Sequence, residues 1–438
     1  MYEKEEQQLK QWYQNIEVPV ELVDEAIFTG YQKAVVERKR QSRLKKTWVT
    51  LAAAVIILVG FFTSIRLSPA FADYITVFPG MEKIVDLIRN DKGKLLAVAN
   101  KYYEKIGVSQ EKNELKMTID GAIMDENGLV LFYTIDSKEK LKDLRMEDVQ
   151  IESMDGEKLN LGSVSMGSPL DWDKSTTSYS DMFEFYFQSP SKAKKLQLKV
   201  SIVNGQKLKE EFNLKFDLKK KVQKKKSYIL NKAVTIEGQK FSFLDADVYP
   251  LRVAVHVKMD PANTKRILSF EDLRLVDESG EIWNKINNGV TASLISPDEA
   301  IIYLQSNYFR EPKELYLVVN KMQAIDKDEV KVIVDTKKSQ ILRQPAGDYL
   351  SNVRMQGDDL LFNLQTKKEF NSFLFSNITD GNGKEIVSTT GFMGGRNEKG
   401  ITEIGINIPG LKNQNSPISL ELTSYPSWIE GEGKIKIK

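Results

Sequence analysis

The chain has 438 residues, and its 63 lysines and arginines nearly balance its 61 aspartates and glutamates, so the overall charge predicts no direct nucleic-acid partner. The composition is that of a folded protein, with 41% hydrophobic and 28% charged residues. Cysteine is absent and His256 is the single histidine, which excludes disulfides, thiolate metal sites, cysteine nucleophiles and multi-histidine metal sites.

Residues 1–46 are too few to form an independent core, and they predict two short amphipathic helices. The first covers residues 9–16, and the second begins near Pro19, where proline suits the first helical turn. Apolar residues recur along the second helix at every fourth position and form one stripe opposite a charged face. Such a stripe fits either the inner leaflet of a membrane or a cytoplasmic protein partner. The candidate partner-binding residues are Trp12, Val23, Ile27, Tyr31 and Val35.

Residues 47–66 predict a transmembrane helix. The 19 residues from 47 to 65 carry no charge and span roughly 28 Å as a helix, close to the ~30 Å of a hydrocarbon core. Lysines and arginines crowd residues 33–46, whereas the charges beyond Arg66 are balanced. This bias predicts a single-pass protein of the cell membrane, with a cytoplasmic N-terminus and an extracytoplasmic C-terminal region. A cleaved signal peptide is the rival interpretation, but the segment before the apolar run is too long for one.

Residues 67–218 predict a membrane-proximal helix that reaches about Tyr103, followed by a first β-domain. From there apolar residues alternate with a period of two, and one order of elements occurs three times. Each copy has a strand pair, a pair around an Asp- or Gly-containing turn, and two alternating strands. The copies occupy residues 116–136, 149–161, 182–189 and 195–202, then 234–258, 273–283, 300–306 and 314–320, then 353–365, 375–387, 401–409 and 418–424.

This pattern predicts a mainly β fold class. N-terminal helices and one transmembrane helix are followed by three tandem antiparallel β-sandwich (immunoglobulin-like) domains. The second β-domain is predicted to cover residues 228–336 and the third to cover 348–438. The lysine run at 219–226 and the segment 336–348 are predicted to be solvated linkers, because a lysine run inside a core is costly. Binding of the lysine run to an anionic wall polymer is the alternative.

No set of residues in the sequence indicates an enzyme or a cofactor site. His256 lies in an alternating strand, where packing is the expected role, and a catalytic triad would rest on it alone. The stretch at 380–383 resembles a calcium loop, but Ile378 and Thr389 occupy positions that need acidic ligands, so a hairpin turn is expected. The sequence therefore predicts no enzyme, no cofactor and no metal ligand.

Three loops at equivalent positions of the copies are candidates for recognition. They cover residues 166–177, 287–300 and 390–400, and they present Trp172, Leu294 and either Phe392 or Met393. Loops on a rigid sandwich often carry binding residues, and the alternative is that these side chains fold back as lids on the cores.

The run SPAFADYITVFPGMEKIVDLIRNDKGKLLAVANKYYEKIG at 68–107, just beyond a single apolar helix, resembles an uncharacterised Gram-positive membrane domain family. The resemblance extends through GAIMDENGLVLFYTI, covers roughly residues 45–220, and includes the N-terminal run LKQWYQNIEVPVELVDEAIFTGYQKA. Members of this family are often labelled negative effectors, or anti-sigma factors, of extracytoplasmic-function sigma factors. This chain lacks the zinc-binding His-x3-Cys-x2-Cys motif of the best-understood anti-sigma proteins. The resemblance therefore implies that sigma binding uses residues 6–46 and transfers no ligand residue.

Two functional hypotheses follow. In the first, the chain is a membrane-anchored negative regulator that holds a cytoplasmic sigma factor inactive, while its outer β-domains sense envelope stress. In the second, it is an anchored envelope-binding or structural surface protein that does not signal. The expected partners are a sigma factor, the cell membrane, and an envelope ligand or wall polymer.

Overall fold

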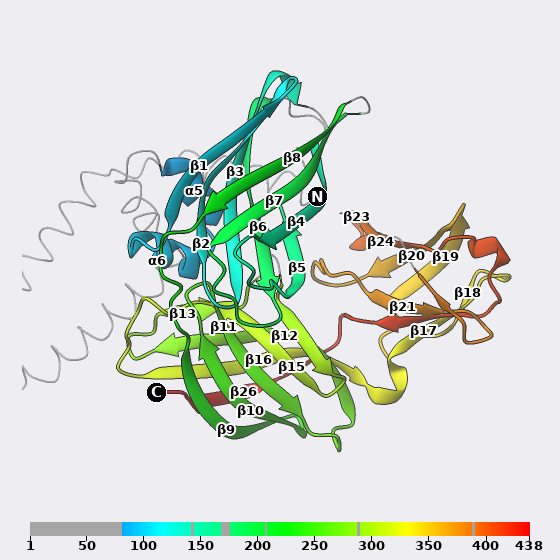
Figure 1. Ribbon diagram of the computed structural model, residues 1–438. Coiled ribbons are helices and arrows are strands. Elements are labelled where there is room, and N and C mark those ends of the chain that lie inside the picture. Colours follow the sequence, from blue (N-terminus) through cyan, green and yellow to red (C-terminus); the bar gives the residue numbers. More distant parts are fainter. Residues whose placement is uncertain (1–80, 142–143, 168–175, 206–207, 287–289, 388–389) are drawn as a thin grey trace, which may run out of the picture. The chain divides into compact units, whose positions relative to one another are not determined.

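The computed structural model describes residues 81–438, except 142–143, 168–175, 206–207, 287–289 and 388–389 (Figure 1). This part of the chain is mainly β, and every strand pairing in it is antiparallel. Neither helix described below has the length and apolar character that crossing a membrane requires. The cytoplasmic helices expected within 1–46 and the span expected at 47–66 lie outside the described residues.

Two short helices, α5 (Glu82–Ile88) and α6 (Lys92–Ala99), stand where one longer helix was expected. The break between them occurs at Asp91, whose side chain accepts a hydrogen bond from the backbone N–H of Lys94 and caps α6. The helices bury their apolar side chains against Val130 and Phe132 of the neighbouring sheet. This cover explains why the run around Phe132 is apolar at every position, since both of its faces are buried.

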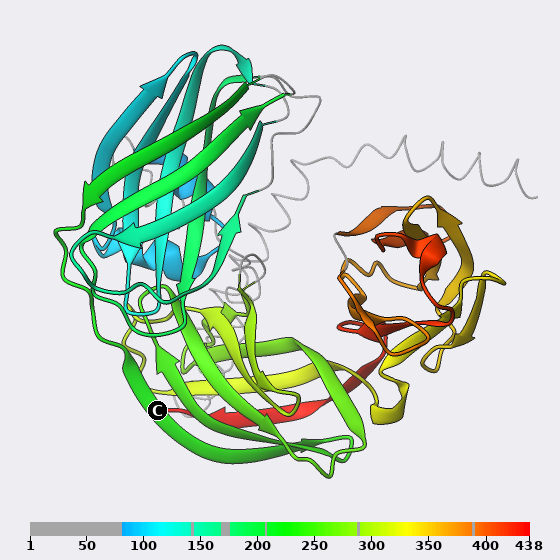
Figure 2. The same cartoon turned by 45° about the vertical axis from the view of Figure 1, so that its right-hand side comes forward.

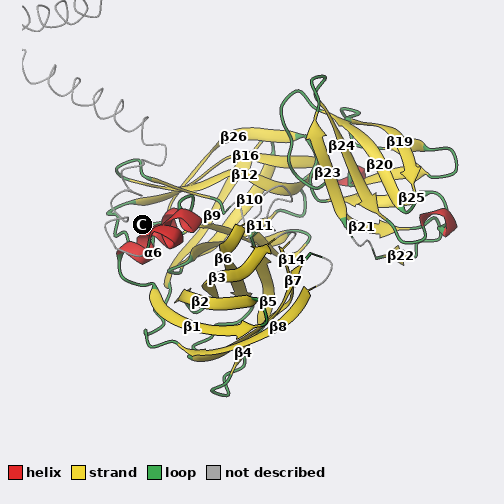
Figure 3. Cartoon of the chain, turned by 90° about the horizontal axis from the view of Figure 1, so that it is seen from above, coloured by secondary structure: helices red, strands yellow, loops and turns green. Residues whose placement is uncertain are grey.

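Module 1 (residues 82–217) has two sheets around one core. The first sheet has the order β1-β2-β3-β6-β5 and the second the order β4-β7-β8. Tyr133 stacks on Phe183 at a ring distance of 4.3 Å in the core. Figure 3 shows the strands of this module from above. The strands are β1 (Glu104–Lys112), β2 (Leu115–Met124), β3 (Gly128–Leu141), β4 (Leu144–Ser153), β5 (Leu161–Met166), β6 (Thr176–Phe187), β7 (Lys195–Asn204) and β8 (Leu208–Asp217).

Module 2 repeats this plan with the sheets β14-β15-β11-β10-β9 and β13-β12-β16-β26. Its core includes the fully buried Trp283 together with Phe241 and Phe243. The strands are β9 (Lys226–Ile236), β10 (Gln239–Val248), β11 (Arg252–Met259), β12 (Lys265–Asp277), β13 (Ile282–Asn284), β14 (Ala292–Ser296), β15 (Glu299–Gln305), β16 (Leu315–Asp326) and β26 (Trp428–Lys436).

Module 3 lies in the sequence between β16 and β26. Its sheets have the orders β18-β17-β25-β21-β22 and β19-β20-β24-β23, and its core includes Phe362 and Tyr425. The elements are η1 (Lys327–Glu329), β17 (Lys331–Asp335), β18 (Gln340–Arg343), β19 (Leu350–Gln356), β20 (Asp359–Gln365), β21 (Phe375–Thr379), β22 (Glu385–Ile386), β23 (Gly391–Arg396), β24 (Ile401–Asn407), η2 (Leu411–Asn413) and β25 (Ile418–Leu422).

The strand that completes module 2 does not follow the other strands of that module in the sequence, because module 3 lies between them. In module 1, β8 pairs with β7, and the backbone N–H of Asn213 reaches the Gln110 side chain on β1. In module 2 the same place is filled by β26, which pairs with β16 and lies beside β9. The strand that directly follows β16 is β17, which instead pairs with β25 of module 3. Figures 1 and 2 show the red C-terminal strand among the green and yellow strands of module 2.

Several sequence predictions need correction. The third domain does not run to 438, because β26 completes the second module. The strands that flank Asp155-Gly156 are not a pair, since β4 and β5 lie in different sheets, whereas the equivalent strands of modules 2 and 3 do pair. The strand order also differs from the immunoglobulin one, because the first three strands of module 1 are neighbours in a single sheet.

Neither predicted linker is simply solvated. Within 219–226, the backbone N–H groups of Lys219 and Lys220 donate to Glu104, and the Lys225 ammonium lies 2.5 Å from a carboxylate oxygen of Asp247. Segment 336–348 contains β18, and the carbonyl of Pro345 accepts a hydrogen bond from the buried Tyr425 hydroxyl. Hydrogen bonds of backbone groups to the modules therefore hold both segments in place. The charge of the segments had predicted only that they are solvated.

Candidate functional site

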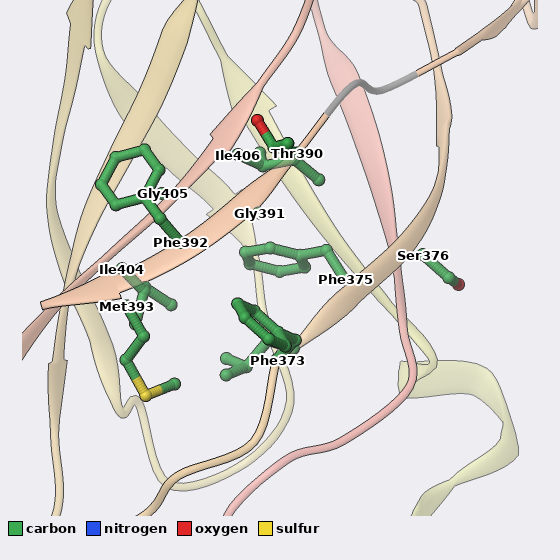
Figure 4. Close-up of a pocket in the computed structure, with 11 residues that line it drawn as sticks. Phe373, Phe375, Ser376, Thr390, Gly391, Phe392, Met393, Ile404, Gly405 and Ile406 are labelled. Atoms are coloured by element: carbon green, nitrogen blue, oxygen red, sulfur yellow. The ribbon is translucent and has the colours of Figure 1, made fainter. Parts of the chain in front are cut away.

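A cavity of about 280 Å³ opens at one side of module 3 (Figure 4). Most of the side chains that line it are apolar, and its polar side chains are the hydroxyls of Ser376 and Thr390. None of its lining residues is charged. The cavity is therefore suited to an uncharged apolar or aromatic group. The lining residues are Phe373, Leu374, Phe375, Ser376, Thr390, Gly391, Phe392, Met393, Ile404, Gly405 and Ile406.

Both sheets of module 3 contribute to the cavity. Phe375 opens β21 in one sheet, whereas Met393 belongs to β23 and Ile404 to β24 of the other. Figure 4 shows Phe373, Phe375, Phe392 and Met393 arranged around the β23 strand. The cavity thus lies where the space between the two sheets opens to solvent, beside the outermost strand of one sheet.

Gly405 permits the close packing of Phe392. A Cβ atom at Gly405 would collide with the Phe392 ring and with Leu361, so only glycine leaves room for the ring over β24. The Phe392 ring covers the outer side of the sheet, while Met393, the next residue, packs partly against the core. Phe392 and Met393 are adjacent in the strand, so their side chains lie on opposite faces of the sheet, and both line the cavity.

Among the described strands, β23 lies at the edge of its sheet and leaves one side unpaired. In the sheet order β19-β20-β24-β23 it has one neighbour, and the N–H of Asn407 donates to the carbonyl of Thr390. Given the pairing of Gly391 with Ile406 and of Met393 with Ile404, the backbone groups of Gly391 and Met393 point away from β24. These N–H and C=O groups line the open edge of the sheet next to the cavity.

The residues predicted for recognition lie in edge strands or outside the described residues. Phe392 is on β23 and 37% exposed, and Leu294 is on β14, at the edge of its own sheet, and 74% exposed. The structure places them in separate modules and not in one site, and Trp172 lies outside the described residues. The prediction of loops was wrong here because an edge strand with one partner needs no regular burial pattern.

Sequence reasoning missed Phe373 and Phe375 as cavity residues. Phe373 is 62% exposed, which is unusual for phenylalanine, and its ring lies against Gly391. The run from Phe370 to Phe375 has three phenylalanines in six residues, and that density is the signal that pointed to an apolar surface. The position of this run opposite β23 depends on how the two sheets pack against each other, which the sequence does not show.

His256 lies on the outer face of β11, and not in the core. Its Nδ1 is 3.1 Å from Asp245 and its Nε2 is 2.8 Å from Glu299, both carboxylates on neighbouring strands. No hydroxyl nucleophile is among these partners. Across the described ranges, no group of three His, Cys, Asp or Glu side chains is arranged to hold a metal ion.

Two buried charged residues, Asp125 of module 1 and Arg252 of module 2, lie where these modules touch. Arg252 is 4% exposed, and its guanidinium lies 5.4 Å from the Tyr186 ring centre and 5.3 Å from that of Tyr303. Burial raises the pKa of Asp125, whereas the nearby Arg252 cation and backbone N–H donors act in the opposite direction. This pair is far in sequence from the cavity, and its contacts indicate a structural role.

Comparison with known proteins gives two partial family matches. Residues 41–137 match a domain of unknown function, DUF4179, and residues 225–343 match a family of unknown function, DUF5643. The first match runs from the basic flank of the predicted membrane segment into β3, and the second covers β9 to β18 without β26. Neither match includes the cavity residues.

One solved structure with a partial likeness is the crystal structure of the conserved domain protein from Bacillus anthracis. It is 17% identical, with 55% of this chain and 84% of that chain covered, at a TM-score of 0.39. No curated protein matches the sequence.

Proposed function

We propose that the chain is a membrane-anchored negative regulator of the anti-sigma type, with extracytoplasmic β-modules that sense the state of the cell envelope. The match to DUF4179 carries this proposal, because it is continuous from residue 41, across the predicted membrane segment, to the first three strands of module 1. The resemblance of this region to proteins labelled anti-sigma factors supports the regulatory role.

The inhibitory part in this proposal is the N-terminal segment. Val23, Ile27, Tyr31 and Val35 form the apolar stripe that would bind a sigma factor, and the charged opposite face would remain in the cytoplasm. The β-modules would receive the signal. The open cavity of module 3 supports that role, since an exposed apolar pocket on a rigid sandwich is typical of a binding site.

The test uses the full-length chain with an N-terminal tag, recovered from membranes in mild detergent. We expect a sigma factor to be recovered with it, and the double variant Ile27→Asp/Tyr31→Asp to lose it. The matched control is Gln32→Ala on the polar face, which should keep it. Removing residues 1–40 should raise transcription from the promoters of that sigma factor.

The alternative function, an anchored envelope-binding or structural protein, predicts other results. Removal of residues 1–40 would leave transcription unchanged, and no sigma factor would be recovered. Protease treatment of intact cells checks the proposed orientation, because only residues beyond 66 should be digested.

A further inference from the structure

The free edge of β23 and the cavity beside it form one surface. We propose that this surface binds an extended peptide segment of another protein, which adds a strand to β23 and places one apolar side chain in the cavity. The biological purpose of this binding rests on the sensing role proposed above. The binding itself does not, because it is measured without any transcription assay.

The first part of the β23 edge, from Gly391 to Met393, is open to strand addition, whereas a β-bulge between Met393 and Arg396 limits an added strand to that part. Natural edge strands are commonly guarded by charged side chains or proline, yet β23 reads GFMGGR, with no proline and with its one charge, Arg396, at the last position. The outward backbone groups of Gly391 and Met393 offer a donor and an acceptor each to an incoming strand. Gly394 and Gly395 present no side chain that would block its approach.

The cavity lies where the added strand would direct a side chain. A strand paired with β23 would run about 4.8 Å from it and would extend the sheet. Its inward side chains would then enter the space between the sheets, where Phe373, Phe375 and Met393 form apolar walls. One phenylalanine, leucine or isoleucine side chain matches this lining and would cover the exposed Phe373 ring.

Charge distinguishes the two ends of the strand. Arg396, at the C-terminal end of β23, donates to the carbonyls of Thr366 and Lys367 and is not bound to a carboxylate in the described part of the chain. The charged residues of the two adjoining turns are mostly basic: Lys367, Lys368, Arg396 and Lys399, against Glu369 and Glu398. This end lies three residues from Met393, with a β-bulge between them.

The complementary partner is therefore a peptide with an acidic end. An antiparallel strand would place acidic residues about three positions before its apolar anchor, so that they reach the basic turns. A small apolar molecule would fill the cavity but leave the edge N–H and C=O groups to water. A peptide uses both features of the surface.

The experiment uses the full-length chain in detergent micelles and a fluorescent synthetic peptide. The peptide has two N-terminal aspartates, a phenylalanine three positions later, and alternating threonine and valine. Fluorescence anisotropy should report saturable binding. Replacement of the phenylalanine by serine, or of the aspartates by lysines, should each weaken binding about tenfold or more.

Variants of the chain locate the binding. Phe373→Ser and the double variant Lys367→Glu/Lys399→Glu change exposed side chains, so the fold should persist while affinity falls about tenfold. The control is Leu294→Ser on the edge strand β14 of module 2, which should bind like the parent. Hydrogen exchange should show the amides of Gly391 and Met393 becoming protected when the peptide is added.

Three outcomes would overturn the proposal. The first is no binding up to about 1 mM peptide. The second is binding that Phe373→Ser and the charge reversal leave unchanged. The third is self-association of the chain through β23, seen as a doubled mass by light scattering that Phe373→Ser removes, because a second copy would then be the occupant. If peptide binding holds while no sigma factor is recovered, only the regulatory proposal fails.

Discussion

Asp125 shows how one buried side chain organises the contact between modules. It lies in the turn between β2 and β3 and is fully buried. Its carboxylate accepts hydrogen bonds from the backbone N–H groups of Asn127 at 2.8 Å and Gly128 at 2.9 Å, and from Leu251 of module 2 at 2.8 Å. The same side chain thus closes the hairpin turn and connects two modules.

Replacing Asp125 by alanine should strongly destabilise the protein. Three N–H donors would lose their acceptor, and the two that are buried, those of Gly128 and Leu251, cost about 1–3 kcal/mol each, so we expect the free energy of unfolding to fall by about 3 kcal/mol. Urea denaturation followed by tryptophan fluorescence measures this. Asp155→Ala is the matched control, since Asp155 is an exposed turn residue, and its effect should be much smaller. Equal losses for the two variants would contradict the role of burial.

Asp380 predicts a dependence of stability on pH. Hydrogen bonds from the Asn415 side chain, and from the backbone N–H groups of Lys384 and Asn382, lower the pKa of Asp380 below its ordinary value of 3.8. These contacts confirm the expected turn at 380–383. A group with a lowered folded-state pKa stabilises the fold above its unfolded pKa and loses that effect as the pH falls through the folded value.

The parent chain should therefore lose stability on acidification below about pH 4, and Asp380→Asn should weaken this dependence. The variant is expected to be less stable than the parent near pH 7 and to approach it in acid. Urea titrations between pH 7 and 2.5 check this. Glu398→Gln, an exposed change on the same module, is the control, and an unchanged acid slope in Asp380→Asn would refute the prediction.

At the scale of elements, β26 completes the sheet of a module that is distant in sequence. Ile429 and Ile435 are 1% and 5% exposed and belong to the core of module 2. Gly433 lacks a Cβ atom, which lets β26 approach Val319 and Val234 closely. Isoleucine and glycine alternate with charged residues along β26, so one face of the strand points into the core.

Ile435→Ala should destabilise module 2 by about 2–5 kcal/mol, because it removes buried methyl groups and leaves a cavity. Glu432→Ala changes an exposed residue of the same strand and should alter stability by less than about 0.5 kcal/mol. Thermal unfolding measures both. If the two variants melt together, β26 does not belong to the core of module 2.

At the scale of the whole described region, modules 2 and 3 are joined by two chain crossings and not by one. The first leads from β16 through η1 to β17, and the second leads from β25 to β26. Arg266 of module 2 also forms a salt bridge of 2.8 Å with Glu421 of module 3. Each module therefore depends on a strand that a cut at the sequence-predicted boundary would remove.

Ending the chain at residue 336 should unfold module 2, because β16 would lose its partner β26 and the core would be exposed. Excising residues 327–427 and joining β16 to β26 through an Asn-Gly turn should restore a cooperative module. Limited proteolysis and circular dichroism distinguish the two. A truncated chain as resistant as the excised one would show that β26 is dispensable.

The sequence by itself determined the β class, the alternating strands, the turns at Asn127-Gly128 and 380–383, and three similar units, because these depend on neighbouring residues. It also predicts the membrane segment at 47–66, which lies outside the described residues. Local pattern did not reveal which strand closes which module, since β17 and β26 both alternate buried and more exposed residues.

Only the tertiary structure placed Phe373 and Phe375 opposite the free edge of β23 to form a cavity. It also placed Asp125 against Leu251, more than a hundred residues away in the chain. Both arrangements depend on how sheets and modules face one another. The relative orientation of sheets and modules is determined by the burial of their complete apolar surfaces, and no short stretch of sequence encodes it.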